Sequence, residues 1–160
     1  MKKVLLTLVL ALAMIQSASA QFEQGKKYVG ASLTGLNLSF SDAKDFAFGL
    51  NGNAGYFIER DLMVLGEVGI NTSNGNLNEF VLGAKGRYYI EQNGIFLAAG
   101  LKYRHLFNSN NDLQVTPEVG YCYFLNRYIT VEPSVYFDLS LTDFSHKSEF
   151  GLKCGIGIYF

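Results

Sequence analysis

The sequence EFGLKCGIGIYF at residues 149–160 alternates apolar with small or polar side chains up to its final aromatic residue. Its apolar side chains share one spacing and are Phe150, Leu152, Cys154, Ile156, Ile158 and Phe160. Successive side chains of a strand point to opposite faces, so the other face carries three glycines, Lys153, Tyr159 and, at its start, Glu149. An apolar face opposite a face of glycine and lysine is typical of a closing strand of a β-barrel in lipid.

The other end of the chain has the features of an export signal. Lys2 and Lys3 form a basic start, residues 4–15 are apolar, and Ala18-Ser19-Ala20 matches a small-residue cleavage site. The apolar run is shorter than the roughly 20 residues that a membrane-spanning helix needs. We therefore predict a cleaved signal peptide over residues 1–20 and a single barrel domain over residues 21–160.

The residues between these ends divide into eight alternating segments separated by turn residues. The segments are residues 27–40, 46–58, 62–71, 80–90, 95–104, 113–124, 129–138 and 149–160. Alternation with a period of two over about ten residues is the signature of transmembrane strands. We predict an all-β fold, an eight-stranded antiparallel up-and-down transmembrane β-barrel. The connections are alternately short and long, as expected for periplasmic turns and extracellular loops.

Glycine followed by aromatic residues closes each even-numbered segment. These clusters lie at residues 55–57, 86–89, 120–123 and 157–160. Because they fall at the same end of their strands, we expect their aromatic side chains to form a girdle at one membrane boundary.

Pro117 and Pro133 fit the pattern worst, because proline cannot donate a hydrogen bond to a strand ladder. They fall in neighbouring predicted strands, where a closed barrel offers no free edge. We expect bulges or a local gap in the ladder at both positions.

Charged residues fall on the faces that would point into the barrel. The interior charge layer that we predict consists of Glu67, Lys85, Arg87, Lys102, Arg104, Glu118, Glu132 and Lys153. Counting residues from the nearest short turn places most of them near the middle of the membrane. Buried charges must pair or hold water. Since eight strands enclose only enough space for side chains, we expect ion pairs to plug the interior, with an ion or proton path as the alternative.

The sequence shows little sign of catalysis or cofactor binding. After removal of the predicted signal, 11 basic and 14 acidic residues leave a net charge of −3, which disfavours nucleic-acid binding. Cys122 and Cys154 are expected on opposite faces of different strands, so no disulfide is predicted. His105 and His146 are both expected in loops, and Ser145, His146 and Asp143 are too close in sequence for a catalytic relay. We predict no catalytic residue, metal or cofactor.

The terminal strand ending in Phe160 is similar to the sorting strand of bacterial outer-membrane barrels. The runs PEVGY at 117–121 and ITVEPSVY at 129–136 resemble the porin-family barrel domains of Bacteroidetes, and the whole pattern resembles small barrels of OmpA/OmpX type. The resemblance implies a Gram-negative outer-membrane location. It also implies contact with outer-membrane lipid and lipopolysaccharide, recognition of Tyr159 and Phe160 by the barrel-assembly machinery, and a monomer.

These features leave three hypotheses for function. The first is a non-enzymatic barrel with a structural or surface-interaction role, its interior plugged by ion pairs. The second is a narrow porin-like channel for ions or very small solutes. The third is an enzyme that modifies outer-membrane lipid.

Overall fold

A computed structural model of the protein describes residues 22–36, 47–73, 76–91, 93–106, 111–141 and 148–160. Those residues form β-strands joined by turns, and among them there is no helix that is long and apolar enough to cross a membrane. The strands are β1 (Lys27–Leu36), β2 (Ala47–Glu59), β3 (Leu62–Ser73), β4 (Asn76–Tyr89), β5 (Ile95–Leu106), β6 (Asp112–Val115), β7 (Glu118–Tyr121), β8 (Tyr123–Phe124), β9 (Ile129–Ser140) and β10 (Glu149–Tyr159).

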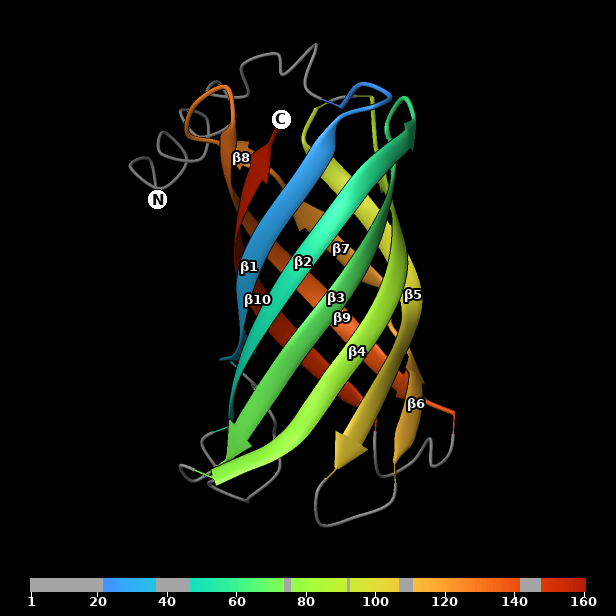
Figure 1. Ribbon diagram of the computed structural model, residues 1–160, viewed down its shortest axis with the longest axis vertical. Helices are drawn as coiled ribbons and strands as arrows, with labels where there is room; N and C mark the ends of the chain where they lie inside the picture. Colours follow the sequence, from blue (N-terminus) through green and yellow to red (C-terminus); the bar gives the residue numbers. More distant parts are fainter. Residues whose placement is uncertain (1–21, 37–46, 74–75, 92, 107–110, 142–147) are drawn as a thin grey trace, which may run out of the picture.

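Each strand pairs antiparallel with its neighbours, and β10 pairs with β1 to close the sheet. The strands β6, β7 and β8 occupy one place in the ring between β5 and β9, so the ring has eight positions. The predicted eight-stranded antiparallel barrel is confirmed. Figure 1 shows tilted strands around a barrel, with the β2–β3, β4–β5 and β8–β9 turns at the upper end, here named the short-turn end.

The barrel is apolar outside and polar inside. Val68, Leu82 and Leu101 on the outer face are 51, 51 and 55% exposed, whereas Gln114 and Glu118 on the inner face are 0 and 2% exposed. A soluble protein would bury the leucines and expose the charges. The exterior is instead matched to hydrocarbon, as in transmembrane barrels.

The predicted sixth strand is broken where Pro117 lies, between β6 and β7, and again at Cys122, between β7 and β8. Pro133 lies within the unbroken β9 and is paired with Cys154 of β10. On the opposite edge of β9, the pairing with β7 and β8 is interrupted at Pro133, beside the second break. The expected local gap is therefore present at both prolines, without the alternative bulge. The breaks do not shift the register, because Thr116 N still donates to Gly100 O and Cys122 N to Gly94 O.

The first strand has one irregularity. Its register against β10 shifts between Thr34 and Leu36, where the sequence pattern also switches face. The predicted continuation to residue 40 lies outside the described residues. As predicted, the cysteines point to opposite faces: Cys122 is buried inside, Cys154 is exposed outside, and both are free.

Candidate functional site

Four charged side chains meet in the middle of the barrel and form what we name the central network. Lys85 Nζ of β4 lies 2.5 Å from Glu67 Oε2 of β3 and 3.0 Å from Glu118 Oε2 of β7. Lys153 Nζ of β10 reaches the same Glu118 oxygen at 2.8 Å. Glu118 is fully enclosed and the other three side chains are at most 9% exposed. Because these strands are distributed around the ring, the network links opposite parts of the wall.

A second ion pair lies closer to the short-turn end. Arg87 Nη1 donates to Glu132 Oε2 at 2.7 Å, and the guanidinium lies over the Phe96 ring at 4.1 Å. The carboxylate of Glu132 also accepts hydrogen bonds from the hydroxyls of Tyr28, at 3.0 Å, and Tyr159, at 2.8 Å. Aromatic faces and hydroxyls thus replace much of the water that this buried pair would need.

Two further pairs lie toward the end of the barrel opposite the short-turn end. Lys102 Nζ contacts both oxygens of Asp138, at 2.8 and 2.7 Å, and Thr116 Oγ1 donates to the same carboxylate at 2.6 Å. Arg104 Nη2 lies 2.6 Å from Glu79 Oε1, and its Nε donates to Glu79 Oε2 at 3.0 Å.

All eight predicted layer residues lie on the inner wall, but they form these separate groups along the barrel instead of one layer. The strands are tilted and staggered, so equal residue counts from different turns do not give equal heights. Two inner acids, Glu79 and Asp112, were missed because each lies one residue before the predicted start of its strand. Asp112 accepts hydrogen bonds from Gln114 and Ser140 at 2.9 and 2.7 Å.

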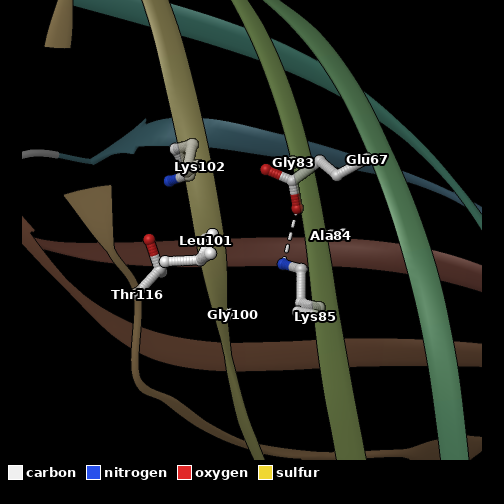
Figure 2. Close-up of a pocket in the computed structure, with 8 residues that line it drawn as sticks. All are labelled: Glu67, Gly83, Ala84, Lys85, Gly100, Leu101, Lys102 and Thr116. Atoms are coloured by element: carbon white, nitrogen blue, oxygen red, sulfur yellow. Dashed lines mark ion pairs between the residues drawn. The ribbon is translucent and has the colours of Figure 1, made fainter. Parts of the chain in front are cut away.

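A small pocket adjoins the central network (Figure 2). It is lined by Glu67, Gly83, Ala84, Lys85, Gly100, Leu101, Lys102 and Thr116. Its volume is about 10 Å³, room for about one water molecule. The space beside the Glu67–Lys85 pair can therefore hold one water molecule but not a larger solute.

Some buried polar atoms on the inner wall lack a hydrogen-bond partner. They include Ser32 Oγ on β1, Asn53 Oδ1 on β2 and Arg87 Nε on β4. A buried polar atom without a partner is costly, and ordered water usually satisfies it. The wall formed by β1 and β2 therefore has the chemistry to hold individual waters.

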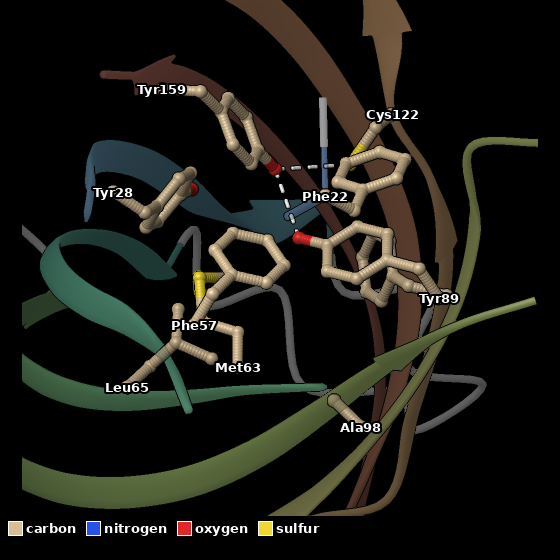
Figure 3. Close-up of a cluster of buried hydrophobic side chains, with 10 residues drawn as sticks. Phe22, Tyr28, Phe57, Met63, Leu65, Tyr89, Ala98, Cys122 and Tyr159 are labelled. Atoms are coloured by element: carbon tan, nitrogen blue, oxygen red, sulfur yellow. Dashed lines mark hydrogen bonds between the residues drawn. The ribbon is translucent and has the colours of Figure 1, made fainter. Parts of the chain in front are cut away.

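The short-turn end of the interior is filled by a group that we name the mouth cluster (Figure 3). It consists of Phe22, Tyr28, Phe57, Met63, Leu65, Tyr89, Phe96, Ala98, Cys122 and Tyr159, all at most 7% exposed. Below the rings, Tyr89 and Tyr159 share a hydrogen bond of 2.9 Å between their hydroxyls. The cluster therefore joins an apolar upper layer to the Arg87–Glu132 pair beneath it.

The mouth cluster corrects the predicted girdle. Only alternate aromatic residues face lipid, including Tyr56, Tyr88 and Phe160, which are 49, 50 and 59% exposed. Their neighbours Phe57, Tyr89 and Tyr159 point inward, because adjacent strand residues face opposite ways. Phe22 was missed because it precedes every alternating segment. In the predicted sorting signal, the side chain of Tyr159 is thus inside and that of Phe160 outside.

The described residues contain no group of three or more His, Cys, Asp or Glu side chains that could hold a metal ion. His105, predicted in a loop, instead lies on the exposed face near the end of β5, and its Nδ1 is 2.7 Å from Asn111 Oδ1. Asp143, Ser145 and His146 lie outside the described residues.

An apolar exterior, a closed antiparallel ring and a buried charged interior together define a transmembrane β-barrel. Residues 5–160 match the model of the outer membrane protein beta-barrel domain, and the chain belongs to that family. The family places the protein in the outer membrane.

Solved structures share the fold at low sequence identity. The N-terminal barrel domain of Pseudomonas aeruginosa OprF is 18% identical, with a TM-score of 0.68, covering 86% of this chain and 98% of that one. A de novo designed transmembrane β-barrel is 15% identical, with a TM-score of 0.54 and coverages of 86 and 98%. Neisserial surface protein A is also 15% identical, with a TM-score of 0.51 and coverages of 84 and 96%. No curated protein sequence matches the chain.

Proposed function

We propose that this protein is a non-enzymatic outer-membrane barrel with a structural or surface-interaction role, whose interior is plugged by ion pairs. The observation that supports the plug most strongly is the central network. Glu118 accepts charge-assisted contacts from Lys85 and Lys153 on different strands while fully enclosed. Such a carboxylate is stable only if its partners stay in place, because an unpaired buried charge costs several kcal/mol.

A plugged interior directs the function to the outside of the barrel. We propose outer-membrane lipid and lipopolysaccharide as the surroundings of the apolar face, and a monomer as the assembled state. We also propose that the barrel-assembly machinery recognises the C-terminal strand. The outward side chain of Phe160 is 59% exposed in the folded barrel, and this outward position supports the role because the interior does not bury the ring.

The second candidate is a narrow channel for ions or very small solutes. The observation in its favour is the row of partnerless polar atoms on Ser32 and Asn53, which could be hydrated. The small pocket beside Glu67 and Lys85 could add a water to such a path. A channel would require these waters to form a continuous chain past the central network.

Planar-bilayer recordings of the folded protein test the proposal. We expect the wild type to show no conductance steps, because the central network fills the middle of the interior. The matched set compares Glu67→Gln and Lys85→Met with Glu59→Gln, which changes an exposed carboxylate at the end of β2. Wild-type steps that vanish in Glu67→Gln or Lys85→Met, but persist in Glu59→Gln, would overturn the plug and establish the channel.

A gel of the outer-membrane fraction, with and without boiling in SDS, tests the membrane location and checks folding. A compact barrel runs faster before boiling and shifts on heating. Recovery of the protein from the soluble periplasm without a shift would contradict the membrane assignment.

A further inference from the structure

The residues that precede β1 enter the short-turn end of the barrel. The Phe22 side chain is 0% exposed and stacks on Tyr89, with ring centroids 3.9 Å apart and an interplanar angle of 16°. Phe124, Tyr159 and Phe57 surround the same ring, with centroid distances of 5.6, 5.8 and 6.1 Å. Figure 3 shows Phe22 among the side chains contributed by the barrel strands. Aromatic side chains from β2, β4, β8 and β10 thus form a socket for it.

Backbone hydrogen bonds hold residues 22–26 in this position. Phe22 O accepts from Asp61 N at 2.9 Å, and Gly25 N donates to Phe57 O at 2.9 Å. Gly25 has a φ of +91°, a conformation that glycine adopts readily and that lets the chain turn back toward the mouth. The segment is therefore fixed at both sides of the turn, and Phe22 is not a loosely attached end.

Polar groups lie directly below the socket. The Tyr159 hydroxyl contacts Cys122 Sγ at 3.3 Å and donates to Glu132 Oε1 at 2.8 Å. Glu132 in turn holds Arg87. Water that passed the rings would reach these groups first, so the socket has to be filled if they are to stay dry.

We propose that the mouth contains an aromatic-binding socket, that Phe22 is its intramolecular ligand, and that this contact seals the short-turn end of the interior. The socket takes an apolar aromatic group the size of a benzene ring, because its walls are the rings of Tyr89, Phe57, Phe124 and Tyr159. Cavities lined by apolar side chains stay dry and bind such molecules.

Cys122 provides a natural probe of the seal. It is 2% exposed within the mouth cluster, whereas the other cysteine, Cys154, faces lipid and can be replaced by alanine. In a Cys154→Ala background, we expect a water-soluble maleimide to label folded wild-type Cys122 slowly. Phe22→Ala should raise the labelling rate by about tenfold or more, because the mouth then opens more easily. Phe80→Ala, which removes a lipid-facing ring, is the matched control and should leave the rate unchanged.

Benzene tests whether the socket recognises an aromatic ring. It should slow the labelling of Phe22→Ala toward the wild-type rate and leave Phe80→Ala unaffected. Unchanged labelling in folded Phe22→Ala would overturn the seal, and failure of benzene to slow it would overturn the aromatic socket. Each sample is checked for folding by its mobility shift on heating. If Phe22→Ala does not fold, Phe22→Leu replaces it. Wild-type Cys122 that reacts as fast in the folded protein as in the unfolded protein would by itself overturn the proposal.

Discussion

The short-turn end of the interior is filled by aromatic rings, whereas the middle is filled by lysine and glutamate side chains. In the mouth cluster, Phe22, Phe57 and Tyr89 pack through their faces and edges. In the central network, Lys85 and Lys153 donate charge-assisted hydrogen bonds to Glu118, which also accepts one from the Ser134 hydroxyl. Shortening a ring in the mouth cluster leaves a cavity. Removing one charged side chain from the central network leaves the opposite charge buried without compensation. The two regions should therefore respond differently to substitution.

The largest effect is expected in the central network. Glu118→Ala leaves Lys85 and Lys153 without their shared carboxylate and should lower the free energy of unfolding by about 3–5 kcal/mol. Urea unfolding in lipid vesicles measures the loss, and Glu59→Ala, at an exposed acid, is the control. Equal stability of the two variants would show that the central charges are not buried in the way described.

The next effect comes from the mouth cluster. Phe57→Ala removes a fully buried ring, while Phe80→Ala removes a ring that lipid can replace. Both lose transfer free energy, but only Phe57→Ala leaves a cavity, which should make it worse by about 2 kcal/mol. The same unfolding measurement compares the pair, and a greater loss in Phe80→Ala would contradict the interior packing.

Glycines that lie beneath inward rings sharpen the comparison further. A Cβ at Gly30 would collide with the Tyr28 ring, whereas one at Gly86 on the outer face would meet nothing. Gly30→Ala should therefore cost about 1–3 kcal/mol of unfolding free energy. Gly86→Ala should be close to neutral, and a loss as large as that of Gly30→Ala would contradict the assigned faces.

The smallest effect is expected at the surface of the short-turn end. Arg60 and Asp61 are 3.9 Å apart, and the Arg60 side chain is 75% exposed. Arg60→Ala should change stability by less than about 0.5 kcal/mol, because water and salt screen such a pair. A larger change in vesicle unfolding experiments would show that this turn contributes more than its exposed ion pair suggests.

The central network was easier to anticipate from sequence than the mouth cluster. Alternation alone assigns Glu67, Lys85 and Glu118 to the inner face, since strand side chains change face at every residue. The same rule also places Phe57 inside and Tyr56 outside. The girdle prediction instead treated each aromatic cluster as a unit and placed both side chains at the membrane boundary. Phe22 could not be found this way, because no strand pattern includes it.

The choice of partners could not be read from the sequence either. Arg87 pairs with Glu132 and Lys102 with Asp138 because the curved wall brings the inner faces of β4 and β5 within reach of β9, across the position of β6 and β7. Which residues meet across a barrel depends on strand tilt and stagger, and these are properties of the closed sheet. Glu118 similarly reaches Lys153 of β10 across the intervening β9.

The most direct test of a plugged interior is a double-mutant cycle between Glu118 and Lys153. Unfolding free energies of Glu118→Gln, Lys153→Gln and the double variant in vesicles give the coupling between the two side chains. A dry network predicts a coupling of about 1.5 kcal/mol or more, barely changed by added salt. A coupling near zero would mean that water screens the pair, and the interior would then be a hydrated path and not a plug.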